Sequence, residues 1–379
     1  MKNRRAAAVP IRSKTPSSIT YAMSRLPIKP GVFVQNIRIQ PQSIEGVSTS
    51  TAAFLGETQA GPSAPTLVTS FTEYQKLFGG YFDEGKYLPY VVEGFFGNGG
   101  KRCFVCSVND GDYAGALAKL EALDASIIYA PNAQATAGLA SALISHCERL
   151  RNRFAIIDSI KGQDPSSVTK PGDSSFAALY YPWIYVKETG TGRLCLVPMG
   201  GHVAGIYVHT DIELGVHKAP SSQLVNGAVG LEVVMKSYQQ DSLMPQGINS
   251  IRSFPGRGLL LWGARTLSSD SEWKYVNLRR LMIYLEQSIK KGTIWVTFEP
   301  NNVSTWAKVK SQTENFLTQT WKSGMLMGAS QQEAFFVHCD KTTMTQNDIN
   351  NGRIIVLIGV AVAKPAEFTI FRVAQTVSS

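Results

Sequence analysis

Strands and helices alternate along the middle of the chain, and this pattern constrains the fold more than any other feature of the sequence. Short runs rich in β-branched and aromatic residues alternate with longer runs whose apolar residues recur at helical spacing. The alternation covers "KRCFVCSV", Ala114–Leu123, "SIIYAP", Ala137–Leu150 and "FAIIDS". Strands and helices in this order form βαβ units with parallel strands. The sequence therefore predicts an α/β middle region.

The last third of the chain predicts a different, α+β arrangement. Two amphipathic helices are expected, one opening near Glu272 and ending at Gly292, the other at Trp306–Trp321. The segments Leu259–Trp262 and "TIWVTFEP" are typical of strands. Residues 160–250 are loop-rich, with "YYPWIYV" as their clearest strand. The expected fold class is α+β with an α/β middle domain.

The C-terminal sequence "GRIIVLIGVAVAKPAEFTIFRVAQ" predicts two strands, and the second has no obvious cover. Residues 354–363 form an unbroken apolar run, typical of a strand buried on both faces. From Glu367 to Val373, apolar residues fall on both faces of the expected strand, and almost no chain follows to cover them. An unpaired strand edge pairs readily with another chain. The pattern therefore requires a partner for this segment.

The positive charge of the chain is concentrated at its N-terminus. The formal net charge is +9, and the first acidic residue, Glu45, follows a series of Lys and Arg residues. Up to about residue 27 the sequence is also rich in Pro, Ser and Ala, which predicts an extended arm that does not fold by itself. Such an arm can bind nucleic acid or reach a neighbouring subunit, and composition leaves both open. Its candidate contact residues are Arg4, Arg5, Val9, Ile11, Arg12, Ile19 and Tyr21.

Two motifs that resemble reactive sites have simpler structural explanations. Cys103 and Cys106 have the spacing of a redox or half-zinc motif, but residues three apart in a strand point to opposite faces. The sequence "GNGGKR", residues 97–102, lacks the Ser or Thr that completes a P-loop, and it follows a helix instead of a strand. We expect two buried thiols and a helix C-cap.

Three histidines also fall close together in the sequence without the spacing of a metal site. His202, His209 and His217 are separated by segments that predict irregular, glycine-rich structure. No nucleophile elbow or isolated acid pair is present, and no run of about 18 apolar residues predicts a membrane span. We therefore expect no enzyme, no catalytic residue, no metal and no cofactor.

Several stretches together resemble the phage tail sheath family, which also supplies the sheaths of R-type pyocins and other contractile injection systems. In chain order they are "PGVFVQNI", "FFGNGGKRCFVCSV", "YYPWIYV", "PMGGHVAGIYVHTDIELGVHKAP", "INSIRSFPGRGLLLWGARTLSSDSEWKYVNLRRLMIYLEQSI", "FEPNN" and "NNGRIIVLIGVAVAKPAEFTIFRVAQ". The combinations "GHVAGIY…GVHKAP" and "WGART…YVNLRRL" are the most specific.

The resemblance implies a structural subunit of a contractile tail sheath. Copies would polymerise as stacked hexameric rings around an inner tube and contract without ATP to drive the tube through a target envelope. The implied partners are other copies, the inner tail tube protein, and baseplate and terminator proteins, with no nucleic acid and no membrane insertion. Assembly would occur in the bacterial cytoplasm, within a phage tail or contractile injection particle. The alternative is a capsid-like protein that binds nucleic acid through its basic arm.

The same resemblance implies a two-domain subunit whose arms add strands to neighbouring subunits. The expected parts are an N-terminal linker arm at 1–27, an outer α/β domain at 28–247, an inner tube-proximal domain at 248–365 and a C-terminal linker strand at 366–379. The inter-subunit strand comprises Glu367, Phe368, Thr369, Ile370, Phe371, Arg372 and Val373, with Lys364 and Pro365 as its hinge. Lys308, Lys310 and Lys322, on the polar side of the second helix, are predicted to face an acidic tube; a solvated helix face is the alternative.

Overall fold

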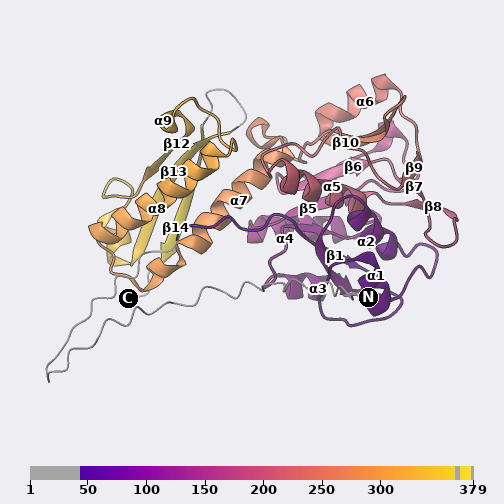
Figure 1. Ribbon diagram of the computed structural model, residues 1–379, viewed down its shortest axis with the longest axis horizontal. Helices are drawn as coiled ribbons and strands as arrows, with labels where there is room; N and C mark the ends of the chain where they lie inside the picture. Colours follow the sequence, from indigo (N-terminus) through magenta and orange to yellow (C-terminus); the bar gives the residue numbers. More distant parts are fainter. Residues whose placement is uncertain (1–42, 363–367, 377–379) are drawn as a thin grey trace, which may run out of the picture. The chain divides into compact units, whose positions relative to one another are not determined.

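The larger sheet of the molecule accounts for the alternation of strands and helices in the sequence (Figure 1). A computed structural model describes residues 43–362 and 368–376, which all belong to one compact unit, 41–379. The sheet has eight strands in the order β11-β10-β6-β5-β4-β1-β3-β2. They are β1 (Thr51–Gly56), β2 (Thr66–Val68), β3 (Arg102–Ser107), β4 (Ile127–Tyr129), β5 (Phe154–Asp158), β6 (Ala177–Tyr181), β10 (Ile248–Phe254) and β11 (Gly258–Trp262).

The middle of this sheet is parallel. Strands β3, β1, β4, β5 and β6 lie side by side in parallel, so that by chain order they run 2-1-3-4-5, an order typical of doubly wound sheets. Strand β10 continues the parallel series beside β6, while β2 and β11 run antiparallel at the two edges. The α/β prediction for the middle region is confirmed. The domain boundary expected at residue 248 falls at the first residue of β10, and β10 belongs to this same sheet. The two-domain division stays a prediction.

Helices cover both faces of the eight-stranded sheet, as strand β1 illustrates. Phe54 lies in one hydrophobic cluster with residues of α1, α2 and α5, whereas the next residue, Leu55, lies in a second cluster with α3 and α4. Every residue of β1 is buried, as expected for a parallel strand between two helical layers. The helices are α1 (Phe71–Phe78), α2 (Leu88–Gly97), α3 (Tyr113–Leu120), α4 (Leu139–Leu150) and α5 (Gly200–Glu213).

Helix α5 shows that the prediction of irregular structure between His202 and His209 is wrong. Glycine lowers helix propensity, but it also lets another backbone approach closely. A Cβ atom at Gly201 would lie 2.3 Å from the carbonyl oxygen of Val91 in α2, and Gly205 faces α2 at a similarly short distance. The glycines of this segment therefore serve the packing of α5 against α2, a role that local propensity does not reveal.

A smaller sheet, in the order β12-β13-β14, forms near the C-terminus and is antiparallel. One face of it packs on two amphipathic helices in a third hydrophobic cluster. Along β13, burial alternates between Ile354 and Leu357, with Ile355 and Leu357 only half-buried, so the predicted burial on both faces holds only for its end, 359–361. The elements are β12 (Phe335–His338), β13 (Arg353–Ala361), β14 (Phe368–Thr376), α7 (Val276–Gly292) and α8 (Val303–Lys322).

Two predicted strands differ from the structure. The segment "YYPWIYV" is divided at Pro182 between β6 and β7 (Ile184–Lys187), because proline lacks the N–H that a continuous ladder requires. The segment "TIWVTFEP" forms the 3-10 helix η4 (Ile294–Phe298), which follows directly on α7. Its β-branched and aromatic residues favour a strand locally, but their tertiary surroundings decide the outcome.

The remaining elements connect these layers. Strand β7 is the middle strand of a third sheet, in the order β8-β7-β9, with β8 (Leu194–Val197) and β9 (Ala228–Leu231). The short helices are η1 (Pro165–Ser167), α6 (Ser237–Leu243), η2 (Met244–Gln246), η3 (Ser271–Trp273), α9 (Gln331–Ala334) and α10 (Gln346–Asn350). None of the helices in the described part of the chain has the length and hydrophobicity that crossing a bilayer requires.

Candidate assembly surfaces

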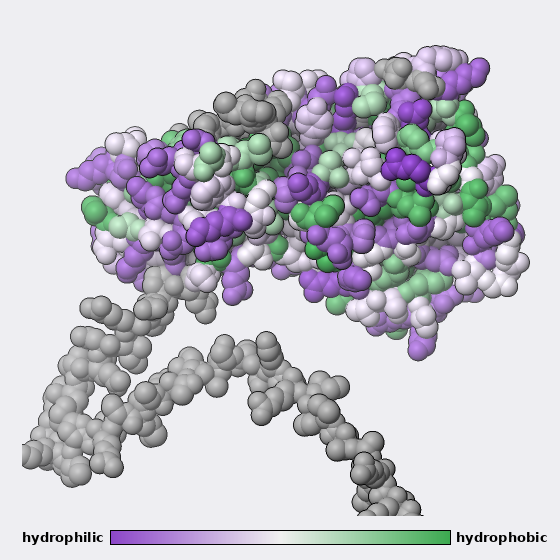
Figure 2. Space-filling model, turned by 45° about the horizontal axis from the view of Figure 1, so that its top comes forward, coloured by the Kyte–Doolittle hydropathy of each residue, from purple (hydrophilic) through white to green (hydrophobic). Residues whose placement is uncertain are grey.

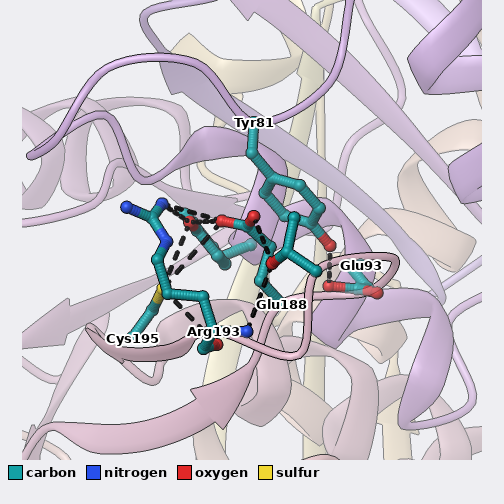
Figure 3. Close-up of polar contacts among 7 residues, drawn as sticks. Tyr81, Glu93, Glu188, Arg193 and Cys195 are labelled. Atoms are coloured by element: carbon teal, nitrogen blue, oxygen red, sulfur yellow. Dashed lines mark hydrogen bonds and ion pairs between the residues drawn. The ribbon is translucent and has the colours of Figure 1, made fainter.

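A polar cluster at α2 resembles a catalytic site in composition, but its side chains are hydrogen-bonded to one another (Figure 3). The hydroxyl of Tyr90 donates to Oε2 of Glu188 at 2.6 Å, and Nη2 of Arg193 donates to the same oxygen at 2.8 Å. A second carboxylate, Glu93, accepts from the hydroxyl of Tyr81. Both carboxylates therefore have their hydrogen-bond partners within the chain, as polar groups of a folded protein usually do. The cluster therefore joins the turn between β7 and β8 to helix α2.

The region where doubly wound sheets bind ligands is filled by the chain itself. Such ligands lie beyond the carboxyl ends of the strands, often at a helix N-terminus. Here Asp158, the last residue of β5, accepts a hydrogen bond at 2.9 Å from the N–H of Gly200, the first residue of α5, and another from the hydroxyl of Tyr129. Burial raises the pKa of Asp158 to about 7, while these bonds favour the carboxylate. The protein's own side chain thus takes the anion position at α5.

The two neighbouring cysteines are buried on opposite faces of β3, as predicted. Cys103 lies in the hydrophobic cluster that contains α2 and α5, and Cys106 lies in the cluster that contains α3 and α4. Burial raises the pKa of Cys106 to about 12, so this thiol stays protonated and unreactive at neutral pH. The preceding "GNGGKR" segment, residues 97–102, begins at the C-terminal end of α2 and leads into β3, in agreement with the helix C-cap prediction.

The histidines of α5 serve different purposes. The ring of His202 packs against α2, where a Cβ atom at Gly94 would lie 2.4 Å from it, and the side chain is only 3% exposed. Burial lowers the pKa of His202 to about 4, so the ring is neutral at pH 7. His209, seven residues further along α5, is exposed. Within residues 43–362 and 368–376, no group of three or more His, Cys, Asp or Glu side chains is placed to hold a metal ion.

Two adjacent arginines of α7 join the C-terminal helices to the eight-stranded sheet. Arg280 donates from Nη1 and Nη2 to the carboxylate of Asp211 in α5, at 2.8 and 2.6 Å, and both side chains are almost fully buried. The guanidinium of Arg279 lies 3.5 Å from the ring centre of Trp273 and 4.4 Å from that of Phe176. The sequence pattern places both arginines on the polar face of α7. Only tertiary packing reveals that this face is buried.

The predicted inter-subunit strand lies at the edge of the C-terminal sheet. Residues 368–376 pair antiparallel with residues 353–361 of the same chain, with Phe371 opposite Ile358. Since β13 lies between β12 and β14, β14 has one ladder, and no strand among the described residues pairs with its outer edge. The nine-residue edge of β14 is therefore open to another chain. Addition of this strand to a neighbouring subunit stays a prediction.

Several of the predicted contact residues lie outside the described part of the chain. Residues Phe368–Val373 are in β14, whereas Glu367 and the hinge residues Lys364 and Pro365 are not described. The same holds for the arm residues Arg4, Arg5, Val9, Ile11, Arg12, Ile19 and Tyr21.

The three lysines predicted to face a tube are not equivalent. Lys308 and Lys322 are exposed on one stripe of α8, fourteen positions apart, which corresponds to about 21 Å along the helix axis. Lys310 is half-buried, and its Nζ lies 3.9 Å from Oε1 of Glu314. The structure therefore leaves Lys308 and Lys322 as the stronger candidates for contact with an acidic surface.

Sequence analysis missed an apolar surface at the junction of η4 and α8. Ile294, Phe298 and Val303 are 69%, 87% and 63% exposed, and they lie within ten residues of one another. Ile294 and Phe298 belong to the predicted strand "TIWVTFEP", and Val303 lies between that strand and the predicted helix Trp306–Trp321. The flanking Gly292 and Pro300 are the local signals that argue against a long strand here.

Comparison with known proteins identifies the family. Residues 107–267 match the phage tail sheath protein central domain, and residues 268–376 match the phage tail sheath C-terminal domain. The contracted helical sheath of the anti-feeding prophage, known from cryo-EM, is 32% identical, with a TM-score of 0.76 over 91% of this chain and 99% of that chain. The contracted sheath of the PVC extracellular contractile injection system is 28% identical, with a TM-score of 0.76 over 93% and 99% of the two chains. The chain therefore belongs to the phage tail sheath family.

A curated relative is matched over part of its length. A prophage major tail sheath protein of Pseudomonas aeruginosa (strain UCBPP-PA14) is 26% identical over 259 residues, which span 66% of this chain and 64% of that protein.

Proposed function

We propose that this protein is a structural subunit of a contractile tail sheath. Copies polymerise as hexameric rings stacked helically around an inner tube, and contraction drives the tube through a target envelope without ATP. The observation that carries this proposal is the open nine-residue edge of β14 in a member of the phage tail sheath family. The occupation of the sheet's ligand region by Asp158 supports a structural function over an enzymatic one.

The C-terminal strand links neighbouring subunits by exchange. In the sheath, residues 368–376 of one copy pair with β13 of the next copy, in place of that copy's own β14. The register is the same in either arrangement, so exchange conserves the ladder, whose bonds contribute about 0.5–1.5 kcal/mol each. Ile358 and Val356 are buried on one face of β13 and stand opposite Phe371 and Val373, so a slip of β14 by one residue would place Arg372 in that buried row. Lys364 and Pro365 act as the hinge, and the arm at 1–27 provides a second link.

Disulfide trapping tests this exchange. Leu357 and Arg372 lie opposite each other in the ladder, so the double variant L357C/R372C can form a disulfide across it. In polymerised protein we expect oxidation to give covalent multimers on non-reducing gels, because the two cysteines of each bond belong to different copies. Oxidation of dilute, unpolymerised protein should give cross-linked monomers. Cross-linked monomers alone, recovered from well-formed polymers, would contradict strand exchange.

Electron microscopy tests the function as a whole. Negatively stained wild-type protein should form long helical tubes. Deletion of residues 366–379 should leave folded subunits that do not polymerise, since the edge strand is lost while the buried face of the sheet keeps β12 and β13. Tubes of normal length from the truncated protein would contradict a linking function for this strand.

An acidic inner tube is the proposed partner of helix α8. Lys308 and Lys322 meet it through contacts that salt weakens and that contraction can break without disrupting a packed core. The variants K308E and K322E should polymerise but fail to coat tubes. The variant K310E, at the half-buried lysine, should impair coating less. Baseplate and terminator proteins would lie at the ends of the sheath. Assembly would take place in the bacterial cytoplasm.

The alternative function, nucleic-acid binding by a capsid-like protein, rests on the basic arm. Residues 1–42 carry eight Lys and Arg residues and no acidic residue. Such binding would be salt-dependent and would disappear on deletion of residues 1–27. A mobility-shift assay with duplex DNA at two salt concentrations separates the two functions, because a sheath subunit should polymerise without shifting the DNA.

A further inference from the structure

The junction of η4 and α8 presents an apolar surface of unusual exposure, which we call the η4 patch. It consists of Ile294, Phe298 and Val303, and Phe298 is 87% exposed. On the face of the molecule seen in Figure 2, hydrophobic residues lie in separate patches between polar ones. Scattered exposed residues of this kind are normal on a protein surface. The η4 patch differs in that three strongly exposed side chains lie within ten residues.

The η4 patch is also held rigidly. Between its members, Val296 is 1% exposed, and Nε1 of Trp295 donates to Oε1 of Gln312 in α8 at 2.9 Å. After η4, the side chain of Asn302 caps α8 by accepting from the N–H of Thr305 at 3.0 Å. The apolar side chains are therefore presented by a fixed backbone, as in protein interfaces where anchors lose little entropy on binding.

The surroundings of the η4 patch indicate where a partner would lie. Helix η4 contacts β14, so the patch borders the strand whose outer edge is open. A chain that pairs with this edge would also lie near η4. The η4 patch therefore includes residues of a helix that contacts the strand proposed to link subunits.

Charge favours another copy of this chain as the partner. The net charge of +9 comes from eight basic residues in 1–42 and one net positive charge in 363–379, so residues 43–362 carry no net charge. Two such neutral bodies can approach without repulsion. An acidic tube, by contrast, would be recognised by cations, which α8 offers at Lys308 and Lys322 and the η4 patch does not.

We propose that the η4 patch is the apolar centre of a contact between neighbouring copies in the polymer. This inference rests on the proposed function, because it assumes that the chain polymerises. Phe298 is its anchor, and Ile294 and Val303 flank it. Since the contact is apolar, it is insensitive to salt, unlike the contact proposed for Lys308 and Lys322.

Matched serine variants of the full chain test this inference. F298S and I294S remove apolar surface at the patch, while V234S, before α6, and Y238S, in α6, remove it at residues that are 74% and 66% exposed. We expect the patch variants to raise the critical concentration for polymerisation at least tenfold, measured by sedimentation and negative-stain microscopy. The control variants should polymerise as the wild type does. Thermal unfolding of all four should match the wild type.

Each other outcome has a distinct meaning. Normal polymers from F298S and I294S would overturn the inference while the proposed function stands, whereas failure of the wild type to polymerise would overturn both. Polymers that form normally but no longer coat tubes would assign the η4 patch to the tube. A fall in the unfolding temperature of F298S would show that the patch is covered within its own chain, which also overturns the inference.

Discussion

The two main sheets of this protein differ in how completely the chain covers them. In the eight-stranded sheet, β1, β5 and β6 are buried along their whole length, and helices lie on both faces. Among the described residues, the C-terminal sheet packs on helices with one face and no strand pairs with the outer edge of β14; the exposed η4 patch includes residues of η4, which contacts β14. Because the second region leaves apolar surface and backbone groups for a partner, it is the region where assembly should occur.

This difference also explains where the charged groups are. Where α7 meets α5 of the first region, the ion pair of Arg280 and Asp211 is buried and matched within the chain. On α8, Lys308 and Lys322 are exposed. Internal charges should therefore control folding, and external charges should control assembly.

The largest effect should come from breaking the buried ion pair between α5 and α7. Asp211→Ala leaves the guanidinium of Arg280 buried without its carboxylate, which should lower the free energy of unfolding by about 3–5 kcal/mol. Urea unfolding of the full chain measures this. The matched control is Asp124→Ala, because Lys291 of α7 pairs with Asp124 on the surface, with side chains 52% and 82% exposed. That pair should contribute at most about 1 kcal/mol. Equal losses would contradict the argument.

The next effect is the response of the eight-stranded region to acid. Burial lowers the pKa of His202 from 6.5 to about 4, so the unfolded chain binds a proton in this window that the native protein excludes, and stability falls on acidification. For Asp158, burial raises the pKa from 3.8 to about 7, so the native protein binds the extra proton and stability rises on acidification. The two contributions oppose each other between pH 7 and 4.

Replacing His202 should reveal the contribution of Asp158 to the pH dependence of stability. In His202→Gln the opposing contribution is lost, so lowering the pH from about 7 to about 4.5 should stabilise the variant relative to the wild type, by up to roughly 3 kcal/mol. Urea unfolding at the two pH values checks the sign. A variant that loses stability in acid as fast as the wild type would show that His202 is not a source of acid sensitivity.

A smaller effect is expected where α2 and α5 approach each other. Gly201→Ala would place a Cβ atom 2.3 Å from the carbonyl oxygen of Val91, so the helices must separate, at about 1–3 kcal/mol. In Gly97→Ala, at the C-terminal end of α2, the added Cβ atom meets no atom within 4 Å, and stability should change by less than about 1 kcal/mol. Thermal unfolding compares the two. Equal melting temperatures would mean that the close packing of these helices is not required.

The smallest effect on folding should come from the partly exposed ion pair of Lys310 and Glu314 on α8. Lys310→Met removes an ion pair with Glu314 at 3.9 Å whose partners are 41% and 37% exposed. The free energy of unfolding should change by less than about 0.5 kcal/mol. A larger change in urea unfolding would show that charges of the C-terminal region hold the fold, contrary to the division between the two regions.

Much of the fold could be predicted from local patterns. The parallel strands follow from the alternation around β3, β4 and β5, and α7 follows from its apolar stripe. The opposite placement of Cys103 and Cys106 follows from the period of a strand. The incorrect predictions have one cause, because local propensity does not account for packing against neighbouring elements. Glycines that suggested a loop are helical in α5 because α2 packs against them, and the β-branched residues of η4 continue from a helix.

Local patterns are sufficient to predict the parallel strands and the amphipathic helices α7 and α8, and they predict a partner for the C-terminal strand. Periodicity and composition carry this information, since they record which side of each element avoids water. Tertiary packing, by contrast, buries Arg279 and Arg280, places Asp158 at the N-terminus of α5, and leaves Phe298 exposed on η4, which contacts β14. These properties depend on groups brought together from distant parts of the chain, and no local pattern records those contacts.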